Sequence, residues 1–185
     1  MFMLEQRLQQ QFFECADLQY QAAETLGRPL SDALLALHAG ITGGGRVLVV
    51  GLGPAAVLAP YFADLLVGGL ERQRPPLAAL ALAEGRAAQQ IQALGQPGDV
   101  LLLVDGSADD SSEAAAVVAS AHGKDMSVVA LGAATPAWRD ALTETDVLVT
   151  AVAERAPRRL ELQLLMLHAL VDALDLQLMG EQDAE

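Results

Sequence analysis

The chain has 185 residues, 52% of them hydrophobic but only 4% aromatic, which is enough for one buried core made mainly of Leu, Val and Ala. A formal net charge of −13, with only eleven Lys and Arg residues, excludes unaided binding to nucleic acid, because each phosphate contact needs a positive side chain. The single cysteine, Cys15, excludes an intrachain disulfide and a cysteine-based metal site, and it fits a reducing compartment.

The N-terminal region predicts two helices. Apolar residues recur every three or four positions from Leu4 to Leu18, which is the spacing of one helix face. A second helix is expected to begin at Ser31-Asp32 and to end at Gly40 and the glycine run 43–45. The first residues lack the basic start and apolar stretch of a signal peptide, and no apolar run is expected to reach a membrane span. These features predict a cytoplasmic protein that does not contact membranes.

Five short apolar runs follow, each bounded by Gly, Pro or Asp, and they predict strands at 46–50, 77–82, 100–104, 126–131 and 147–149. Ala-rich stretches with helical spacing lie between them, for example at 55–70 and 112–121. Alternating strands and helices with right-handed crossovers predict an α/β fold with a doubly wound parallel sheet.

The last helix is expected to begin near Pro157, since proline is tolerated in a first turn. It is apolar on almost every side, which predicts burial against another subunit as well as against the sheet. The whole chain, 1–185, is therefore expected to form one domain. Its parts are N-terminal helices in 1–44, the sheet core in 45–150 and an oligomerisation helix in 157–179.

Two loops at the carboxyl ends of predicted strands are candidate sites, because ligands of such folds bind there. The first contains Gly51, Gly53 and Ala55 and matches a dinucleotide-binding turn only loosely, since Pro54 has no N–H for a pyrophosphate. A tight turn that lets strand and helix pack closely is the better interpretation of its two glycines.

The second loop carries Asp105, Ser107, Asp109 and Asp110. At ~4 Å and an effective dielectric constant near 20, one like-charge pair costs about 4 kcal/mol, whereas a neutral hydroxyl hydrogen bond contributes about 1 kcal/mol. The three carboxylates are therefore expected to exclude phosphate. Their spacing departs from a calcium loop at its essential glycine, so a solvated helix N-terminus is the simpler interpretation.

The histidines give no catalytic pattern. His38, His122 and His168 are scattered without metal-ligand spacing, and Ser107 has no evident histidine partner for nucleophilic chemistry. A lone His168 inside an apolar helix is more often a core or interface residue than a catalyst.

Three stretches, at Leu70–Pro75, Ala93–Leu102 and Leu164–Asp175, resemble the SIS (sugar isomerase) domain family, in the branch that holds phosphoheptose isomerases and the DnaA initiator-associating proteins (DiaA). The likeness covers nearly the whole chain. It implies a flavodoxin-like, five-stranded parallel sheet behind an N-terminal helical segment. It also implies a homo-oligomer, usually a tetramer with the terminal helices at its centre, although a dimer stays open.

The resemblance further implies that the family's site is altered. The phosphate-binding Ser of the first loop is Ala55 here, and the Ser-rich second loop keeps only Ser107. The segment between 82 and 95 is also shorter than in the family by about a helix. In phosphoheptose isomerases a His and Glu of one helix and a Gln and His of the last build a zinc site and an acid/base pair, and the matching positions here are Tyr61, Leu65, Leu160 and His168. These losses predict a catalytically silent protein with no metal or cofactor, whose vestigial ligand pocket comprises Gly51, Gly53, Ala55, Asp105, Ser107, Asp109, Asp110 and His168.

The leading functional hypothesis is a non-catalytic adaptor, a homo-oligomer that gathers several copies of a protein partner through multivalency. The resemblance makes DnaA the candidate partner, in the regulation of replication initiation, and places the contact at Leu178 and Met179. The alternative is a phosphoheptose isomerase-like or other sugar-phosphate protein, acting on sedoheptulose 7-phosphate. A third hypothesis is a structural role in a complex with an intact paralogue.

Overall fold

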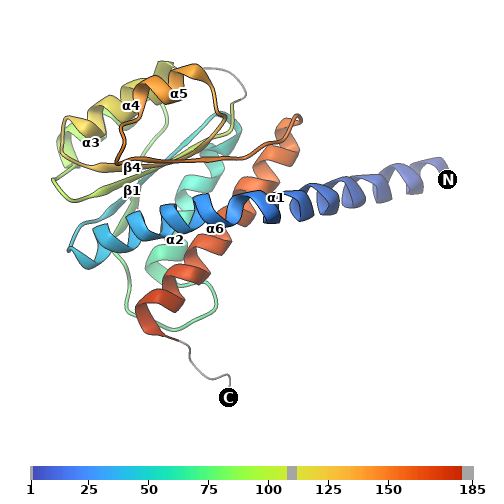
Figure 1. Ribbon diagram of the computed structural model, residues 1–185, viewed down its shortest axis with the longest axis horizontal. Helices are drawn as coiled ribbons and strands as arrows, with labels where there is room; N and C mark the ends of the chain where they lie inside the picture. The colour runs from blue at the N-terminus through green and yellow to red at the C-terminus, as the bar shows by residue number, and fades with distance from the viewer. Residues whose placement is uncertain (1, 108–111, 181–185) are drawn as a thin grey trace.

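A computed structural model describes residues 2–107 and 112–180 and shows one α/β body from which a long helix projects (Figure 1). The five strands are β1 (Val47–Leu52), β2 (Ala79–Ala81), β3 (Val100–Asp105), β4 (Ser127–Gly132) and β5 (Val147–Thr150). All are parallel, in the order β2-β1-β3-β4-β5. Each falls within or overlaps a predicted run, so the prediction of a doubly wound, flavodoxin-like parallel sheet is confirmed.

The sheet is buried on both faces, as parallel sheets are. Val47 and Val49 pack on one side with three helices, α1 (Phe2–Thr42), α2 (Leu58–Gly68) and α6 (Ala156–Met179). Leu48 and Val50 pack on the other with α3 (Ala87–Leu94), α4 (Ser112–His122) and α5 (Pro136–Ala141). A short 3₁₀ helix, η1 (Gly53–Val57), joins β1 to α2. The sequence patterns did not predict the short helices α3 and α5.

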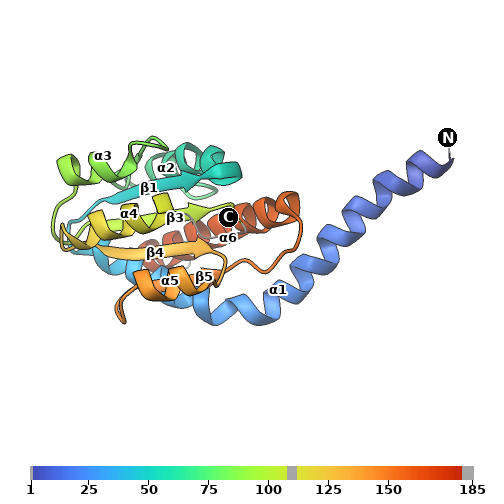
Figure 2. The same cartoon turned by 90° about the horizontal axis from the view of Figure 1, so that it is seen from above.

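The N-terminal region is one continuous helix of 41 residues, so the prediction of two helices is wrong. Pro29 lies inside α1, and Ser31 does not cap a new helix because its hydroxyl donates to the carbonyl of Gly27, one turn back. Only the second half of α1 packs on the body, through Ala22, Leu26 and neighbouring apolar residues. Figure 2 shows the first half extending well beyond the sheet.

Helix α6 crosses the face of the sheet between α1 and α2 (Figure 1). By length and composition it could span a membrane, contrary to the expectation that no run would reach that length, and 44% of its most apolar window is buried inside the protein. Its apolar residues on several sides pack on the sheet, on α1 and on α2. Burial within the same chain thus explains much of its apolar composition.

Candidate active site

The two glycine-containing loops meet at the carboxyl edge of β1 and β3. Leu52 and Asp105 are paired in register at the strand ends, and the N–H of Gly106 donates to the carbonyl of Leu52 at 3.2 Å. A Cβ on Gly106 would lie 2.7 Å from the backbone nitrogen of Ala55, so only glycine lets the loops approach this closely. Gly53 has a φ of +56°, which also favours glycine.

The structure therefore brings together several of the predicted pocket residues, Gly51, Gly53, Ala55, Asp105 and Ser107. A Cβ on Gly53 would lie 3.4 Å from the Ser107 hydroxyl, across the two loops. Asp109 and Asp110, which belong to the same prediction, lie outside the described residues.

Two acidic side chains at this edge of the sheet, Asp105 and Glu84, accept hydrogen bonds from backbone N–H groups. Asp105 is 1% exposed, and its Oδ1 accepts a hydrogen bond from the N–H of Ser107 at 2.9 Å, which closes the loop as an Asx turn does. Glu84, from the loop after β2, accepts from the N–H of Gly53 at 2.6 Å. The carboxylate of Asp105 thus does not line an open loop surface, and the prediction that it helps to exclude phosphate loses that support.

Helix α6 contributes two polar side chains that the sequence analysis missed. Gln163 is fully buried, and its Nε2 donates to the carbonyl of Asp105 at 2.7 Å and to that of Leu131 at 3.2 Å. Arg159, one turn earlier, donates to the carbonyls of Gly106 and Ala153, each at 3.0 Å. The sequence contained a signal for these two residues, because a polar side chain on an otherwise apolar helix needs a hydrogen-bond partner if that helix is buried.

His168 lies further along α6 and faces Tyr61, which is in the first turn of α2. Tyr61 Oη and His168 Nε2 are 2.7 Å apart, and the two rings meet edge-on with centroids 5.6 Å apart. His168 follows Gln163 by five residues, or about 7.5 Å along the helix axis. A hydrogen-bonded pair of ionisable side chains, accessible to solvent, thus joins α2 to α6, the helix whose Gln163 contacts the ends of β3 and β4.

A buried ion pair fixes α2 against α6. The guanidinium of Arg74 contacts the carboxylate of Asp175, and both side chains are 1% exposed. Arg74 also donates to the carbonyls of Leu65 at 3.0 Å and Leu66 at 2.7 Å, near the end of α2. The geometry of the Tyr61–His168 pair therefore depends on these contacts.

The zinc site that the resemblance implies does not fit this chain. Of the four matching positions, Leu65 and Leu160 have no atom that can bind a metal, which leaves only Tyr61 and His168. Within residues 2–107 and 112–180, no three His, Cys, Asp or Glu side chains gather as metal ligands. The chemistry of this site must therefore be derived from the side chains that are present.

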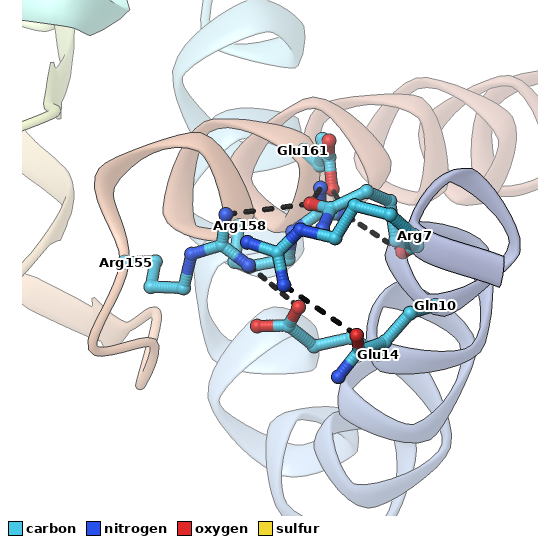
Figure 3. Close-up of polar contacts among 7 residues, drawn as sticks. Arg7, Gln10, Glu14, Arg155, Arg158 and Glu161 are labelled. Carbon is cyan, nitrogen blue, oxygen red and sulfur yellow. Dashed lines mark hydrogen bonds and ion pairs between the residues drawn. The ribbon is translucent and has the colours of Figure 1, made fainter. Parts of the chain in front are cut away.

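A second polar cluster joins α1 to the start of α6 (Figure 3). Arg155 donates to Glu14 at 2.5 Å, and Arg158 donates to Glu161 at 2.5 Å. The side-chain oxygen of Gln11 accepts from Arg155 at 3.3 Å and from Arg158 at 3.2 Å. Each of these two arginines thus has a carboxylate partner, and the cluster ties the projecting helix to the body.

Other reactive side chains have structural roles. Burial, followed by the hydrogen bond and charge of Glu161, raises the pKa of the Cys15 thiol, which disfavours the nucleophilic thiolate. His122 lies 2.8 Å from Asp146, whose carboxylate also accepts from the backbone and hydroxyl of Thr143 and so holds the turn before β5.

The two residues predicted to contact a partner lie at the end of α6. Leu178 is half-buried against the core, and Met179, the last residue of the helix, is 40% exposed. A substantial part of this pair's apolar surface therefore serves the protein's own packing.

Comparison with known proteins agrees with this geometry. The SIS domain family matches residues 11–133. The chain is 46% identical to a phosphoheptose isomerase from Methylibium petroleiphilum over 199 aligned residues, which cover 99% of each protein. It is 34% identical to a phosphoheptose isomerase from Azoarcus sp., covering 96% of this chain and 98% of the relative.

Two solved structures share the whole fold. Phosphoheptose isomerase GmhA from Neisseria gonorrhoeae superposes with a TM-score of 0.82 at 28% identity, covering 93% of this chain and 98% of that one. A phosphoheptose isomerase from Francisella tularensis superposes with a TM-score of 0.79 at 26% identity, covering 92% and 97%. The chain therefore belongs to the phosphoheptose isomerase family of SIS-domain proteins.

Proposed function

We propose that this protein is a phosphoheptose isomerase, which interconverts sedoheptulose 7-phosphate and the corresponding aldoheptose phosphate. The observation that carries the proposal is the 46% identity to a phosphoheptose isomerase, along with coverage of 99% of both chains. Likeness over that length includes the sheet, the loops at its carboxyl edge and the helices α2 and α6 that face them.

The interpretation of the chain as a non-catalytic adaptor of the DiaA kind is wrong. It rested on residues missing from the family's site, but the relatives that span the whole chain, in sequence and in structure, are phosphoheptose isomerases. The findings support the sugar-phosphate alternative instead. Judging catalysis from one set of family residues overlooked groups such as Tyr61, which brings its own hydroxyl to the position of a lost ligand.

The Tyr61–His168 pair offers an acid–base route for the reaction. Tyr61 Oη accepts the proton from C1 of the ketose and passes its own proton to His168 Nε2, 2.7 Å away. The electron pair of the broken C1–H bond forms the C1–C2 double bond of an enediolate. The pair then returns the proton to C2, while the proton of the C1 hydroxyl moves to the C2 oxygen. Atoms and electrons balance, so no co-reactant is required.

The direct test is conversion of sedoheptulose 7-phosphate, followed by proton NMR in D2O so that solvent deuterium at C2 of the aldose reports proton transfer. The wild type should convert the ketose. Tyr61→Phe and His168→Asn should each lower kcat by about 10²- to 10⁴-fold, which is the usual contribution of general acid–base catalysis. Tyr20→Phe is the matched control, because Tyr20 is 74% exposed on α1. Absence of turnover by the wild type would refute the isomerase proposal.

We also propose that the protein is a homo-oligomer. The first half of α1 carries large exposed apolar side chains, among them Phe12 at 77% and Phe13 at 67% exposure, and a second copy of the chain can bury them. Phe12→Glu with Phe13→Glu should lower the native mass measured by light scattering, and Gln9→Glu should not. An unchanged mass would count against this face. The cytoplasmic location expected from the sequence stays a prediction, which the likeness to phosphoheptose isomerases supports.

A further inference from the structure

Apolar contacts alone leave the rotation of helix α6 on the sheet poorly determined. Apolar side chains on several sides of this helix pack on the sheet, on α1 and on α2. The hydrophobic effect is non-directional, so a helix with apolar residues around most of its circumference can bury similar areas in more than one rotation. Directional contacts are needed to select one of them.

Gln163 makes two such contacts. Its side chain is fully buried, and its amide nitrogen carries two N–H donors. The nitrogen donates to the carbonyl of Asp105, the last residue of β3, at 2.7 Å, and to the carbonyl of Leu131, in the adjacent strand β4, at 3.2 Å. Hydrogen bonds weaken steeply when they are misaligned, so both form only over a narrow range of helix rotations.

Burial of the amide turns this geometry into a constraint. An amide out of water is unfavourable unless its hydrogen bonds form, so a rotation of α6 that removes Gln163 from the two carbonyls is penalised. A buried polar residue can select one arrangement in this way, as a single Asn sets the register of a coiled coil. Arg159, one turn earlier, adds contacts to the carbonyls of Gly106 and Ala153 at the same edge of the sheet.

His168 lies between two buried polar anchors of α6. Gln163 precedes it by five residues, and Asp175, the partner of Arg74, follows it by seven. The imidazole meets Tyr61 of α2, with 2.7 Å between Tyr61 Oη and His168 Nε2. Figure 1 shows α6 crossing the sheet between α1 and α2. The rotation that Gln163 fixes therefore also decides where the imidazole lies relative to Tyr61 and to the strand ends.

A small rotation is enough to displace the imidazole. A helix with its side chains has a radius of about 5–6 Å, so a rotation of about 10° moves the end of a side chain by about 1 Å. The hydrogen bond between Tyr61 and His168 does not tolerate such a shift, because a separation of about 3.6 Å is no longer a hydrogen bond. Misplacement of a catalytic group by about 1 Å can lower the rate by about 100-fold.

We propose that Gln163 is a positioning residue, which fixes the rotation of α6 on the ends of β3 and β4 and so holds His168 within reach of Tyr61 and of the substrate. Because Gln163 is fully buried, it acts on the reaction through His168. This inference rests on the proposed isomerase function for the reaction that the Tyr61–His168 pair serves. The position of His168 is nevertheless measurable without substrate.

The test compares the wild type with Gln163→Met, which keeps an unbranched side chain but has no donor. Proton–nitrogen NMR of the ligand-free proteins follows the histidine rings. Those of His168 should move, whereas those of His38 on α1 and His122 on α4 should not. With sedoheptulose 7-phosphate, kcat should fall by about 10- to 100-fold and KM should change little, because the chemical step depends on the position of His168.

Two further variants serve as controls. Gln177→Met changes an exposed residue of the same helix and should behave as the wild type does. Gln163→Asn keeps the amide on a side chain shorter by one methylene, so it should reach only one carbonyl and give an intermediate result. Thermal melts check folding, and Gln163→Asn provides the comparison alone if Gln163→Met does not fold.

The outcomes separate positioning from a merely structural role. Unmoved His168 resonances in the Gln163 variants overturn the proposal, even where the melting temperature falls. Moved resonances with an unchanged kcat overturn it too, because the reaction then does not depend on where Gln163 holds the ring. If the wild type does not turn over sedoheptulose 7-phosphate, the isomerase proposal fails, whereas moved His168 resonances would still support control of the ring by Gln163.

Discussion

Replacing Asp175 with asparagine should destabilise the protein strongly, although the two side chains have nearly the same shape. Asp175 is the carboxylate partner of Arg74, and both side chains are 1% exposed. The substitution leaves a guanidinium buried beside the carbonyls of Leu65 and Leu66 without its counter-charge. Breaking a buried pair in this way costs about 3–5 kcal/mol of the free energy of unfolding.

Urea unfolding followed by circular dichroism, at one fixed protein concentration, measures this loss. With an m-value of about 2 kcal/mol/M, the midpoint should fall by roughly 1.5–2.5 M. Asp172→Asn, an exposed position on the same helix, is the control and should shift the midpoint little. Because α2 and α6 carry Tyr61 and His168, turnover of Asp175→Asn should fall even where the variant is still folded.

The double variant Arg74→Met with Asp175→Leu tests the cause of the loss. It removes both charges, so it should be more stable than Asp175→Asn alone, as replacement of a buried ion pair by apolar groups often is. A free energy of unfolding for Asp175→Asn within about 0.5 kcal/mol of the wild type would refute the argument that the pair, rather than the apolar contacts around it, holds α2 to α6.

Three further substitutions test the segments just before β1 and β3 and helix α1. Burial raises the pKa of Asp99, but hydrogen bonds from the side chain and backbone of Arg46 outweigh this and hold the pKa below the ordinary 3.8. A lowered folded-state pKa gives stability that is present above pH 3.8 and is lost as the pH falls through the folded-state value, so Asp99→Asn should cost about 1–3 kcal/mol at pH 7 and much less at the acid limit. Thermal melts from pH 7 down to pH 2 measure this, and parallel curves for the two proteins would contradict it. Gly45→Ala should cost at least 1–3 kcal/mol, roughly the value for overpacking, because its Cβ would lie 2.1 Å from the backbone oxygen of Gly98. A Cβ on Gly27 would have no atom within 4 Å, so Gly27→Ala should instead stabilise α1 by about 0.5–1 kcal/mol. Equal melting temperatures for Gly45→Ala and Gly27→Ala would contradict these predictions.

The α/β fold could be predicted from the sequence because its cause is local. Each strand is a short run of β-branched or Leu residues bounded by turn residues, and a fully buried parallel strand needs little more. The helix 2–42 was wrongly divided before Ser31 because a Ser-Asp pair usually marks the start of a helix. Packing of Ala33 and Leu37 on the body, beyond Ser31, stabilises the continuous helix and outweighs that local preference.

The candidate site was only partly predictable. Gly53, Ala55 and Ser107 could be located because the carboxyl ends of adjacent parallel strands meet at one edge. The resemblance placed Tyr61 and His168 at one altered site, but their hydrogen bond was not predicted, since the two residues are 107 positions apart in the chain. Spacing along the chain does not predict such a contact, which forms because α2 packs on α6.

The sequence by itself determined the order of strands and helices, the two loops and the acidic charge, because these follow from periodicity and composition within short windows. Only the tertiary structure decided which charges are compensated. It paired Arg74 with Asp175 and directed the carboxylate of Asp105 to the N–H of Ser107 in its own loop. It also placed the buried guanidinium of Arg159 against the carbonyls of Gly106 and Ala153. The electrostatic energy of a charged side chain depends on its burial and on its distance from other charges. These distances are fixed only when segments far apart in the sequence pack together.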